Sequence, residues 1–208
     1  MFLTLIYYSS VKGGVFLQEK RYHHGNLKVA LIEAGINIIN EFGELGLSLR
    51  KVAAKCNVSQ SAPYAHFKNK EDMIHAMQEH VTEQFMKVLE RAIVDEREGS
   101  KELILKMGEA YISFFIDNPH YFRFLFFTPY LHINLSLNEE EDIYPPYKLF
   151  KRHAVRLLEE MNCPREAMLS RITNLWGTVQ GIALIATQEN VTYDGDFKKD
   201  IYKIISNE

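Results

Sequence analysis

The stretch SLRKVAAKCNVSQSAPYAHFKNK, Ser48–Lys70, predicts two short helices joined by a tight turn and followed by a polar stop. Ser48 is placed to cap the first helix, LRKVAAKC, through its hydroxyl. Asn57 occupies the turn, where a left-handed backbone is best tolerated by Gly and next best by Asn. Pro63 falls in the first turn of the second helix, Gln60–Phe67, where no intrahelical N–H is lost. The pattern is that of a helix-turn-helix.

An amphipathic helix precedes this motif. Apolar residues recur at three- and four-residue steps from Leu27 to Phe42, which is the pattern of a helix with one buried face. Asn26 is a predicted N-cap and Gly43 a predicted stop. Together the three helices predict a small N-terminal domain over residues 20–72.

A long helix is predicted after the motif. It begins in Asn69–Asp72, whose acidic residues suit a first helical turn, and its apolar stripe continues to about Arg97. At 1.5 Å per residue, a helix of about 28 residues is about 42 Å long, which is enough to connect two domains. Gly99 and Ser100 then interrupt the pattern.

The remaining chain shows helical periodicity and no strand pattern. We predict helices over about 101–117, over an aromatic segment that ends before 128–129, over 147–161, over 164–189 and over a terminal amphipathic segment, with an acidic loop at 130–143. The fold is therefore predicted to be all-α, with a leader at 1–19, a helix-turn-helix domain at 20–72 and a helical domain at 73–208.

Charge is distributed unevenly along the chain. Residues 1–70 hold nine Lys or Arg and four Glu, a net charge of +5, whereas the whole chain carries −3, so the remainder carries −8. A basic head on an acidic body is typical of a DNA-binding module attached to a second domain, and a helix-turn-helix places its second helix in the major groove. Double-stranded DNA is the expected partner.

The two cysteines, Cys56 and Cys163, lie far apart and lack CxxC or histidine spacing. This argues against a disulfide or a metal site and favours a reducing, cytoplasmic location. The apolar start, MFLTLIYYSS, is too short to span a bilayer and lacks a basic n-region, so no membrane partner is expected.

The codons of Lys12-Gly13-Gly14 could form a purine run like a bacterial ribosome-binding site. One hypothesis is therefore that translation begins near Leu17 and that residues 1–16 are not translated. The alternative is a frayed apolar leader.

The segment LSLRKVAAKCNVSQSAPYAHFKNKEDMI resembles the TetR family of transcriptional regulators, whose pattern reads T-x-x-x-I-A-x-x-A-G-V-S-x-x-x-x-Y-x-H-F-x-x-K-E-x-L. The resemblance covers about residues 24–77. Asn57 replaces the usual Gly, and Pro63 replaces a more usual apolar residue and should stiffen the second helix. The resemblance implies an N-terminal three-helix DNA-binding domain and a C-terminal helical domain for ligand binding and dimerisation.

The resemblance also implies roles for individual residues. Gln60 can pair bidentately with adenine and Arg50 with guanine, whereas Tyr64 can position the helix on the phosphates. Phe67 is expected in the core. The expected DNA contacts are Ser48, Arg50, Ser59, Gln60, Ser61, Ala62, Tyr64, His66 and Lys70. An arm of Lys20, Arg21, His23 and His24 is expected to reach phosphates or the minor groove, with a solvated tail as the alternative.

The C-terminal half is rich in aromatic residues, which are commonly core residues. The resemblance implies that this half encloses a small apolar or aromatic ligand, because apolar walls with few polar groups suit such a pocket. The expected lining is Met107, Tyr111, Phe114, Phe115, Phe122, Arg123, Phe126, Tyr147, Trp176 and Gln180, with His120 and Thr178 as further polar candidates.

The segment LWGTVQGIALIA, residues 175–186, resembles the W-x-x-x-H-G signature of one C-terminal class of the family. Gln180 stands where that class has His. Two glycines four residues apart leave a flat helix face, and the resemblance implies a homodimer interface made by Leu175, Gly177, Val179, Gly181, Ile182 and Ala186. An ordinary buried helix is the alternative.

These observations predict a dimeric, ligand-responsive transcriptional repressor that binds a palindromic operator. One alternative is an architectural DNA-binding protein without an inducer. Another is an enzyme with a recruited DNA-binding head, but the chain shows no nucleophile–base pair, phosphate loop or metal cluster at usable spacing, so neither catalysis nor a cofactor is expected. A haem or metal sensor is a third; His75, His80, His120, His132 and His153 are scattered and expected to be mostly exposed.

Overall fold

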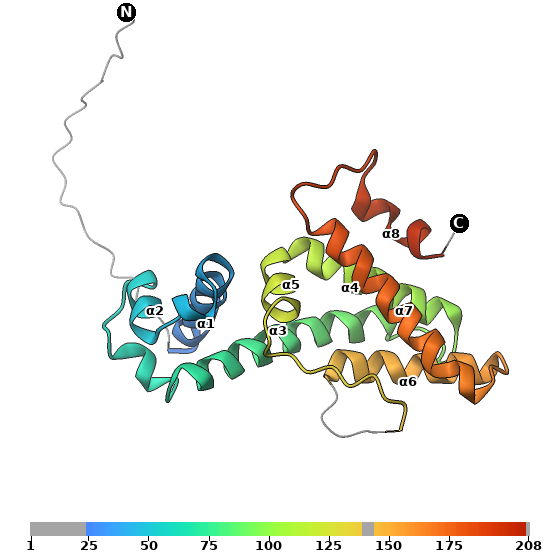
Figure 1. Cartoon of the computed structure of the whole chain (residues 1–208), viewed down its shortest axis with the longest axis horizontal. Helices are drawn as coiled ribbons and strands as arrows, with labels where there is room; N and C mark the ends of the chain where they lie inside the picture. Colours follow the sequence, from blue (N-terminus) through green and yellow to red (C-terminus); the bar gives the residue numbers. More distant parts are fainter. Residues whose placement is uncertain (1–23, 139–143, 207–208) are drawn as a thin grey trace, which may run out of the picture.

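The computed structural model describes residues 24–138 and 144–206, and all regular secondary structure in these residues is helical, without a strand. The predicted leader lies outside the described residues. The prediction of an all-α protein with an N-terminal helix-turn-helix domain and a C-terminal helical domain is confirmed. A head of α1, α2 and two short 3-10 helices lies at one end, and a larger body lies at the other (Figure 1).

The head begins with α1, His24–Phe42. The helix starts two residues before Asn26, so the prediction of Asn26 as its N-cap was wrong. Gly43 ends it as predicted, with φ at +70° and its N–H donating to the carbonyl of Ile39 at 2.8 Å. The 3-10 helix η1, Glu44–Gly46, then turns the chain toward α2, Leu49–Lys55.

The helix-turn-helix has the predicted cap and turn. The Ser48 hydroxyl accepts from the N–H of Lys51 at 3.2 Å, and Asn57 has φ at +54°. The second helix is shorter than predicted. Instead of 60–67 it is the 3-10 helix η2, Ala62–Ala65, with Pro63 in its first turn.

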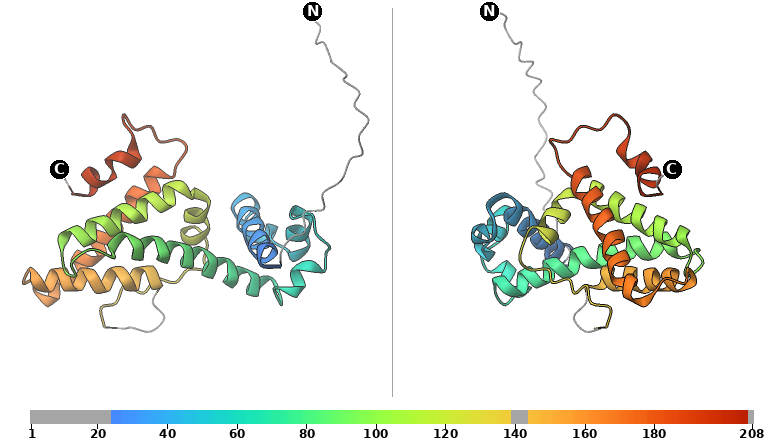
Figure 2. Two further views of the ribbon diagram at one scale, coloured as in Figure 1. Left: turned by 180° about the vertical axis from the view of Figure 1, so that it is seen from behind. Right: turned by 45° about the vertical axis from the view of Figure 1, so that its right-hand side comes forward.

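The helix α3, Lys70–Ile93, leads from the head into the body, as two further views show (Figure 2). Asn69 caps it by accepting from the N–H of Asp72 at 2.8 Å. It has 24 residues, four fewer than predicted, and is therefore about 36 Å long. Gly99, with φ at +73°, completes the turn that the sequence predicted here.

The body is built on α4, Lys101–Asp117, which packs against α3, α6, α7 and α8. The other helices are α5, Pro119–Phe126; α6, Pro145–Glu160; α7, Arg165–Ala186; and α8, Phe197–Ser206. Two predicted bounds were wrong: α6 starts at its two prolines, which its first turn accommodates, and α7 ends three residues before 189.

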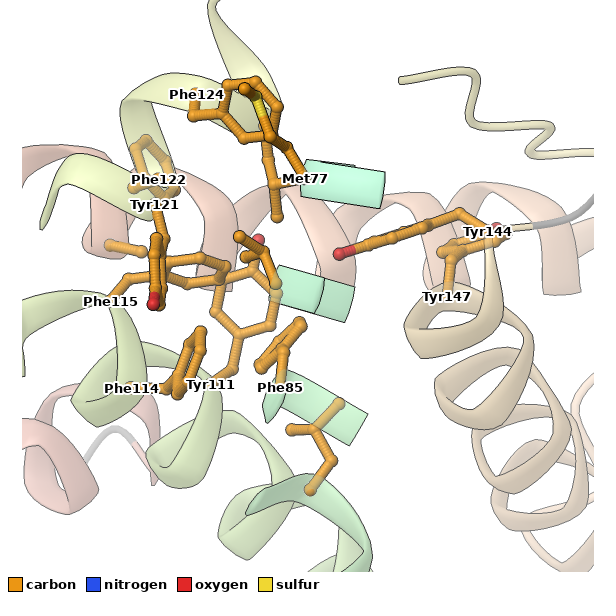
Figure 3. Packing of buried hydrophobic residues seen from close by; sticks show 14 of the residues in the cluster. Met77, Phe85, Tyr111, Phe114, Phe115, Tyr121, Phe122, Phe124, Tyr144 and Tyr147 are labelled. Atoms are coloured by element: carbon orange, nitrogen blue, oxygen red, sulfur yellow. The ribbon is translucent and has the colours of Figure 1, made fainter. Parts of the chain in front are cut away.

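The body's core is a stack of aromatic rings from α3, α4, α5, α6 and α7. Phe85 of α3 lies at its centre, with ring centroids 5.0 Å from Tyr111 and Phe114 and 4.9 Å from Phe115 (Figure 3). Each of these rings is at least nine-tenths buried. Every helix in the described part of the chain is too short or too polar to cross a lipid bilayer.

Candidate nucleic-acid interface

The residues just before η2, the second element of the helix-turn-helix, present polar side chains to solvent. Pro63 is buried, and Phe67, two residues after η2, is only 2% exposed, so these two side chains anchor η2 in the core of the head. The burial of Phe67 was expected. Ser59, Gln60 and Ser61 are exposed. This is the arrangement that groove reading requires, with an apolar anchor on one side and hydrogen-bonding groups on the other.

The rest of the predicted contact set surrounds this element. Ser59 and Ser61 share a hydrogen bond between their hydroxyls at 3.1 Å. Tyr64 is 55% exposed, an unusual amount for so large a ring, while Ala62 and His66 are half-buried. The exposed hydroxyl-bearing ring can therefore reach a backbone phosphate without rearrangement of the head.

The first helix of the helix-turn-helix, α2, carries three cations. Arg50 and Lys51 are exposed at the start of the helix and form no ion pair with any residue the structure describes. Lys55 lies 3.7 Å from the carboxylate of Glu41. Unpaired surface cations are the groups that exchange counterions for DNA phosphates at the lowest desolvation cost.

Lys70, expected to clamp phosphate, is engaged inside the head. Its ammonium donates to the backbone carbonyl of Glu44 at 2.8 Å and lies 3.4 Å from the Glu44 carboxylate. Lys70 thus ties the start of α3 to η1. Lys20, Arg21 and His23 of the expected arm lie outside the described residues, as does the side chain of His24.

The residues expected to line a ligand pocket fall into three groups. Met107, Tyr111 and Trp176 border a cavity of about 60 Å³ between α4, α7 and α8. Phe122 and Arg123 instead border a groove of about 630 Å³ between the head, α5 and the end of α7. The others, Phe114, Phe115, Phe126, Tyr147 and Gln180, are in neither lining; Gln180 accepts a hydrogen bond from the Tyr111 hydroxyl.

The predicted dimer helix, α7, has one open face. A Cβ built on Gly177 or Gly181 meets no atom within 4 Å. Leu175 and Val179 face inward instead and line the cavity beside α4, while Ile182 and Ala186 are half-buried. At these two glycines the single chain therefore leaves open space beside α7.

Sequence reasoning missed a cluster at the boundary between head and body. Glu33 of α1 contacts His80 of α3 and both His120 and Tyr121 of α5. The expectation of mostly exposed histidines was wrong, because His80 and His120 are half-buried and His153 is buried. No pattern along the chain signals the cluster, since 47 residues separate Glu33 from His80.

Among the described residues, no group of three or more His, Cys, Asp or Glu is arranged to hold a metal ion.

Residues 31–77 match the family model for bacterial regulatory proteins of the tetR family. The match contains α1 from Leu31 onward, the helix-turn-helix and the start of α3. No curated protein matches the sequence.

Solved structures match along nearly the whole chain. A candidate transcriptional regulator from Pseudomonas aeruginosa PAO1 is 20% identical with a TM-score of 0.69, over 92% of this chain and 92% of that one. A TetR-like transcriptional regulator from Rhodococcus sp. RHA1 is 12% identical with a TM-score of 0.64, over 90% and 97%. FadR from Bacillus subtilis, solved with stearoyl-CoA, is 16% identical with a TM-score of 0.64, over 86% and 95%. At these identities the structures show a shared fold for head and body together.

Proposed function

Because the chain belongs to the TetR family of bacterial regulatory proteins, we propose that this DNA-binding regulator represses transcription as a homodimer on a palindromic operator. The observation that carries the proposal is the head, where Ser59, Gln60 and Ser61 are exposed just before the anchored 3-10 helix η2 and α2 carries exposed cations. Two such heads would read half-sites about 34–36 Å apart.

The open positions of Gly177 and Gly181 on α7 support the proposed dimer. Neither Gly177 nor Gly181 has a neighbour that a Cβ would meet, which leaves a flat surface on an otherwise packed body. Two such faces around a two-fold axis form a self-complementary interface. The pair of heads then acquires a defined spacing from the two bodies.

The ligand in this proposal is a small apolar or aromatic molecule taken up by the body. The cavity between α4, α7 and α8 is nearly all apolar, with Tyr111, Trp176 and Thr178 as its lining residues that carry a hydrogen-bonding group. At about 60 Å³ it must widen to admit a drug-sized molecule, since such pockets measure about 300–1,000 Å³. Widening would move α4, and the ligand need bind the released form only about 10⁴-fold more tightly to reverse a 1:99 equilibrium.

A long-chain acyl thioester is the first compound to test, because the B. subtilis FadR structure contains stearoyl-CoA. Its addition should release the protein from its operator. An architectural DNA-binding protein would instead stay bound to DNA whatever ligand is added.

Genome-wide chromatin precipitation of the protein expressed from its own promoter tests the proposal. The expected result is a few sites sharing a two-fold symmetric motif, with transcription beside them rising when the chromosomal gene is deleted. Enrichment without a symmetric motif would contradict palindromic recognition, and falling transcription would contradict repression.

A further inference from the structure

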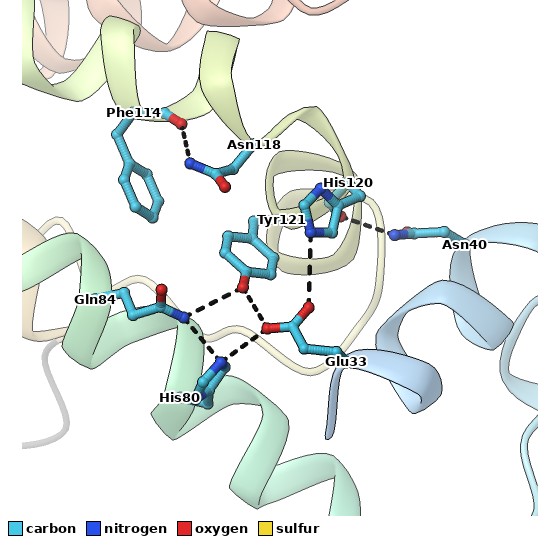
Figure 4. Close-up of polar contacts among 8 residues, drawn as sticks. All are labelled: Glu33, Asn40, His80, Gln84, Phe114, Asn118, His120 and Tyr121. Atoms are coloured by element: carbon cyan, nitrogen blue, oxygen red, sulfur yellow. Dashed lines mark hydrogen bonds and ion pairs between the residues drawn. The ribbon is translucent and has the colours of Figure 1, made fainter. Parts of the chain in front are cut away.

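The head contacts the body through the carboxylate of Glu33, which extends from α1 and contacts side chains of α3 and α5. Glu33 projects from α1 and places one oxygen, Oε1, 2.8 Å from Nε2 of His80 on α3. Its other oxygen, Oε2, lies 3.8 Å from Nε2 of His120 on α5 (Figure 4). The Tyr121 hydroxyl, also from α5, donates to Oε1.

A second layer of hydrogen bonds holds the donors in place. Gln84, one turn along α3 from His80, donates to the Tyr121 hydroxyl at 3.2 Å. The rings of His120 and Tyr121 lie 4.2 Å apart. Asn40, two turns along α1, donates to the backbone carbonyl of His120 at 2.8 Å. The head is thus bound to α5 by side chains at two levels of α1.

The protonation states match these roles at neutral pH. Burial alone would raise the pKa of Glu33, but the hydrogen bonds from His80 and Tyr121 outweigh it and leave that pKa below its usual value. Burial lowers the pKa of His120, against the opposing effect of Glu33. Burial and the hydrogen bond to Glu33 raise the pKa of Tyr121 to about 12. A charged carboxylate therefore accepts from the neutral Tyr121 hydroxyl, which gives a charge-assisted hydrogen bond.

Partial burial makes these contacts stronger than surface ones. The side chain of His80 is 19% exposed and that of Glu33 is 31% exposed. By contrast Glu41, on the same helix, is 58% exposed and pairs only with Lys55 inside the head. The two carboxylates carry the same charge on the same helix, but only Glu33 crosses from head to body.

We propose that Glu33 is the positioning residue that holds the DNA-binding head in one orientation on α5, so that the Glu33–His80–Tyr121 cluster is a latch between head and body. This inference rests on the proposed function only for its consequence, the spacing of two heads on DNA. The latch itself is a property of the single chain. When it is broken, α1 keeps its fold but the head samples more than one orientation about α3.

Pulsed electron paramagnetic resonance tests the latch without DNA or ligand. Spin labels at Ala54→Cys in the head and Lys101→Cys in the body, in a chain whose Cys56 and Cys163 are replaced by Ala, report one head–body distance. The labelled protein is diluted with unlabelled protein to suppress distances between protomers. Circular dichroism verifies that each variant is folded.

Glu33→Gln should broaden the head–body distance distribution, whereas the matched Glu41→Gln should leave it as narrow as in the parent. Tyr121→Phe removes one donor and no charge, so it should broaden the distribution too, and it serves alone if Glu33→Gln fails to fold. Unchanged distributions in Tyr121→Phe and in folded Glu33→Gln would overturn the proposal. Equal broadening by Glu41→Gln would overturn it as well, because charge rather than position would then be the cause. None of these results depends on whether the protein represses transcription.

Discussion

At the scale of single residues, the turn of the helix-turn-helix depends on the backbone of Asn57. Its φ of +54° lies in the left-handed region, which costs a β-branched residue about 1–2 kcal/mol. Asn57→Val should therefore lower the free energy of unfolding by about that amount, and Asn57→Gly should leave it unchanged or raise it. Urea unfolding followed by circular dichroism measures both. Equal stability of the Val and Gly variants would show that the turn does not require this conformation.

Gln60 gives the matching prediction for recognition. Its exposed amide can pair with an adenine edge, so Gln60→Ala should lose about 1–3 kcal/mol of discrimination at one base pair. Lys51→Ala, an exposed cation one helix away, should weaken all sequences alike and reduce the salt dependence of binding. Fluorescence anisotropy with single-base operator variants separates the two effects. Lys70→Ala is a poor substitute for Lys51→Ala in this experiment, since it also removes the hydrogen bond from Lys70 to the Glu44 carbonyl of η1.

At the scale of elements, local chemistry made several features predictable. Ser48 and Ser100 each accept from the N–H three residues on, and both lie where a polar residue precedes an apolar stripe. Gly43 and Gly99 adopt positive φ where the helical pattern stops. The lengths of η2 and α3 were predicted less well, because neighbouring elements and not the local sequence decide where a helix ends.

The caps make a prediction about α4. Ser100→Ala should cost about 1 kcal/mol, since the N–H of Leu103 loses its acceptor. Ser170→Ala is a suitable control, because that hydroxyl bonds to a carbonyl within α7 and caps no helix. Thermal unfolding of both variants checks this, and equal loss in the two would contradict a capping role.

The contact between head and α5 predicts a dependence on pH. The pKa of Glu33 is lower in the folded chain than its usual value, so its stabilising contribution is complete above the unfolded pKa of about 4.5 and is lost as pH falls through the folded value. The charged groups around the nearby surface groove, Lys28, Glu79 and Glu83, are the same in parent and variant. The difference in stability between the parent and Glu33→Gln should therefore stay constant above about pH 4.5 and shrink as the pH falls below that value, a range set by the lowered pKa. A constant difference over this range would contradict the ionised state of Glu33.

At the scale of the whole molecule, the sequence predicted the division into a basic head and a helical body, because charge and periodicity are properties of the chain itself. It could not predict the cluster at Glu33, whose members come from α1, α3 and α5 and meet only in the folded protein. Nor could it separate core from pocket among the aromatic residues. Phe114 and Phe115 pack on Phe85, Trp176 borders the cavity, and Tyr111 does both, yet all four belong to the same aromatic pattern.

Assembly of two chains gives a prediction at this scale. Gly177→Arg adds a large side chain where the single chain leaves open space, so it should preserve the fold but prevent dimerisation. Glu159→Arg, an exposed position on α6, is the control. Analytical ultracentrifugation should find monomers only for the Gly177 variant. A dimeric Gly177→Arg would place the interface elsewhere.

The most direct measurement of the central claim is selection of the purified protein's binding sites from a random duplex DNA library. The account predicts enrichment of a two-fold symmetric sequence with half-sites about one helical turn apart, bound by two chains per duplex. Gln60→Ala should relax the preference at one symmetric pair of positions. Enrichment of no sequence, or of an asymmetric site bound by one chain, would contradict it.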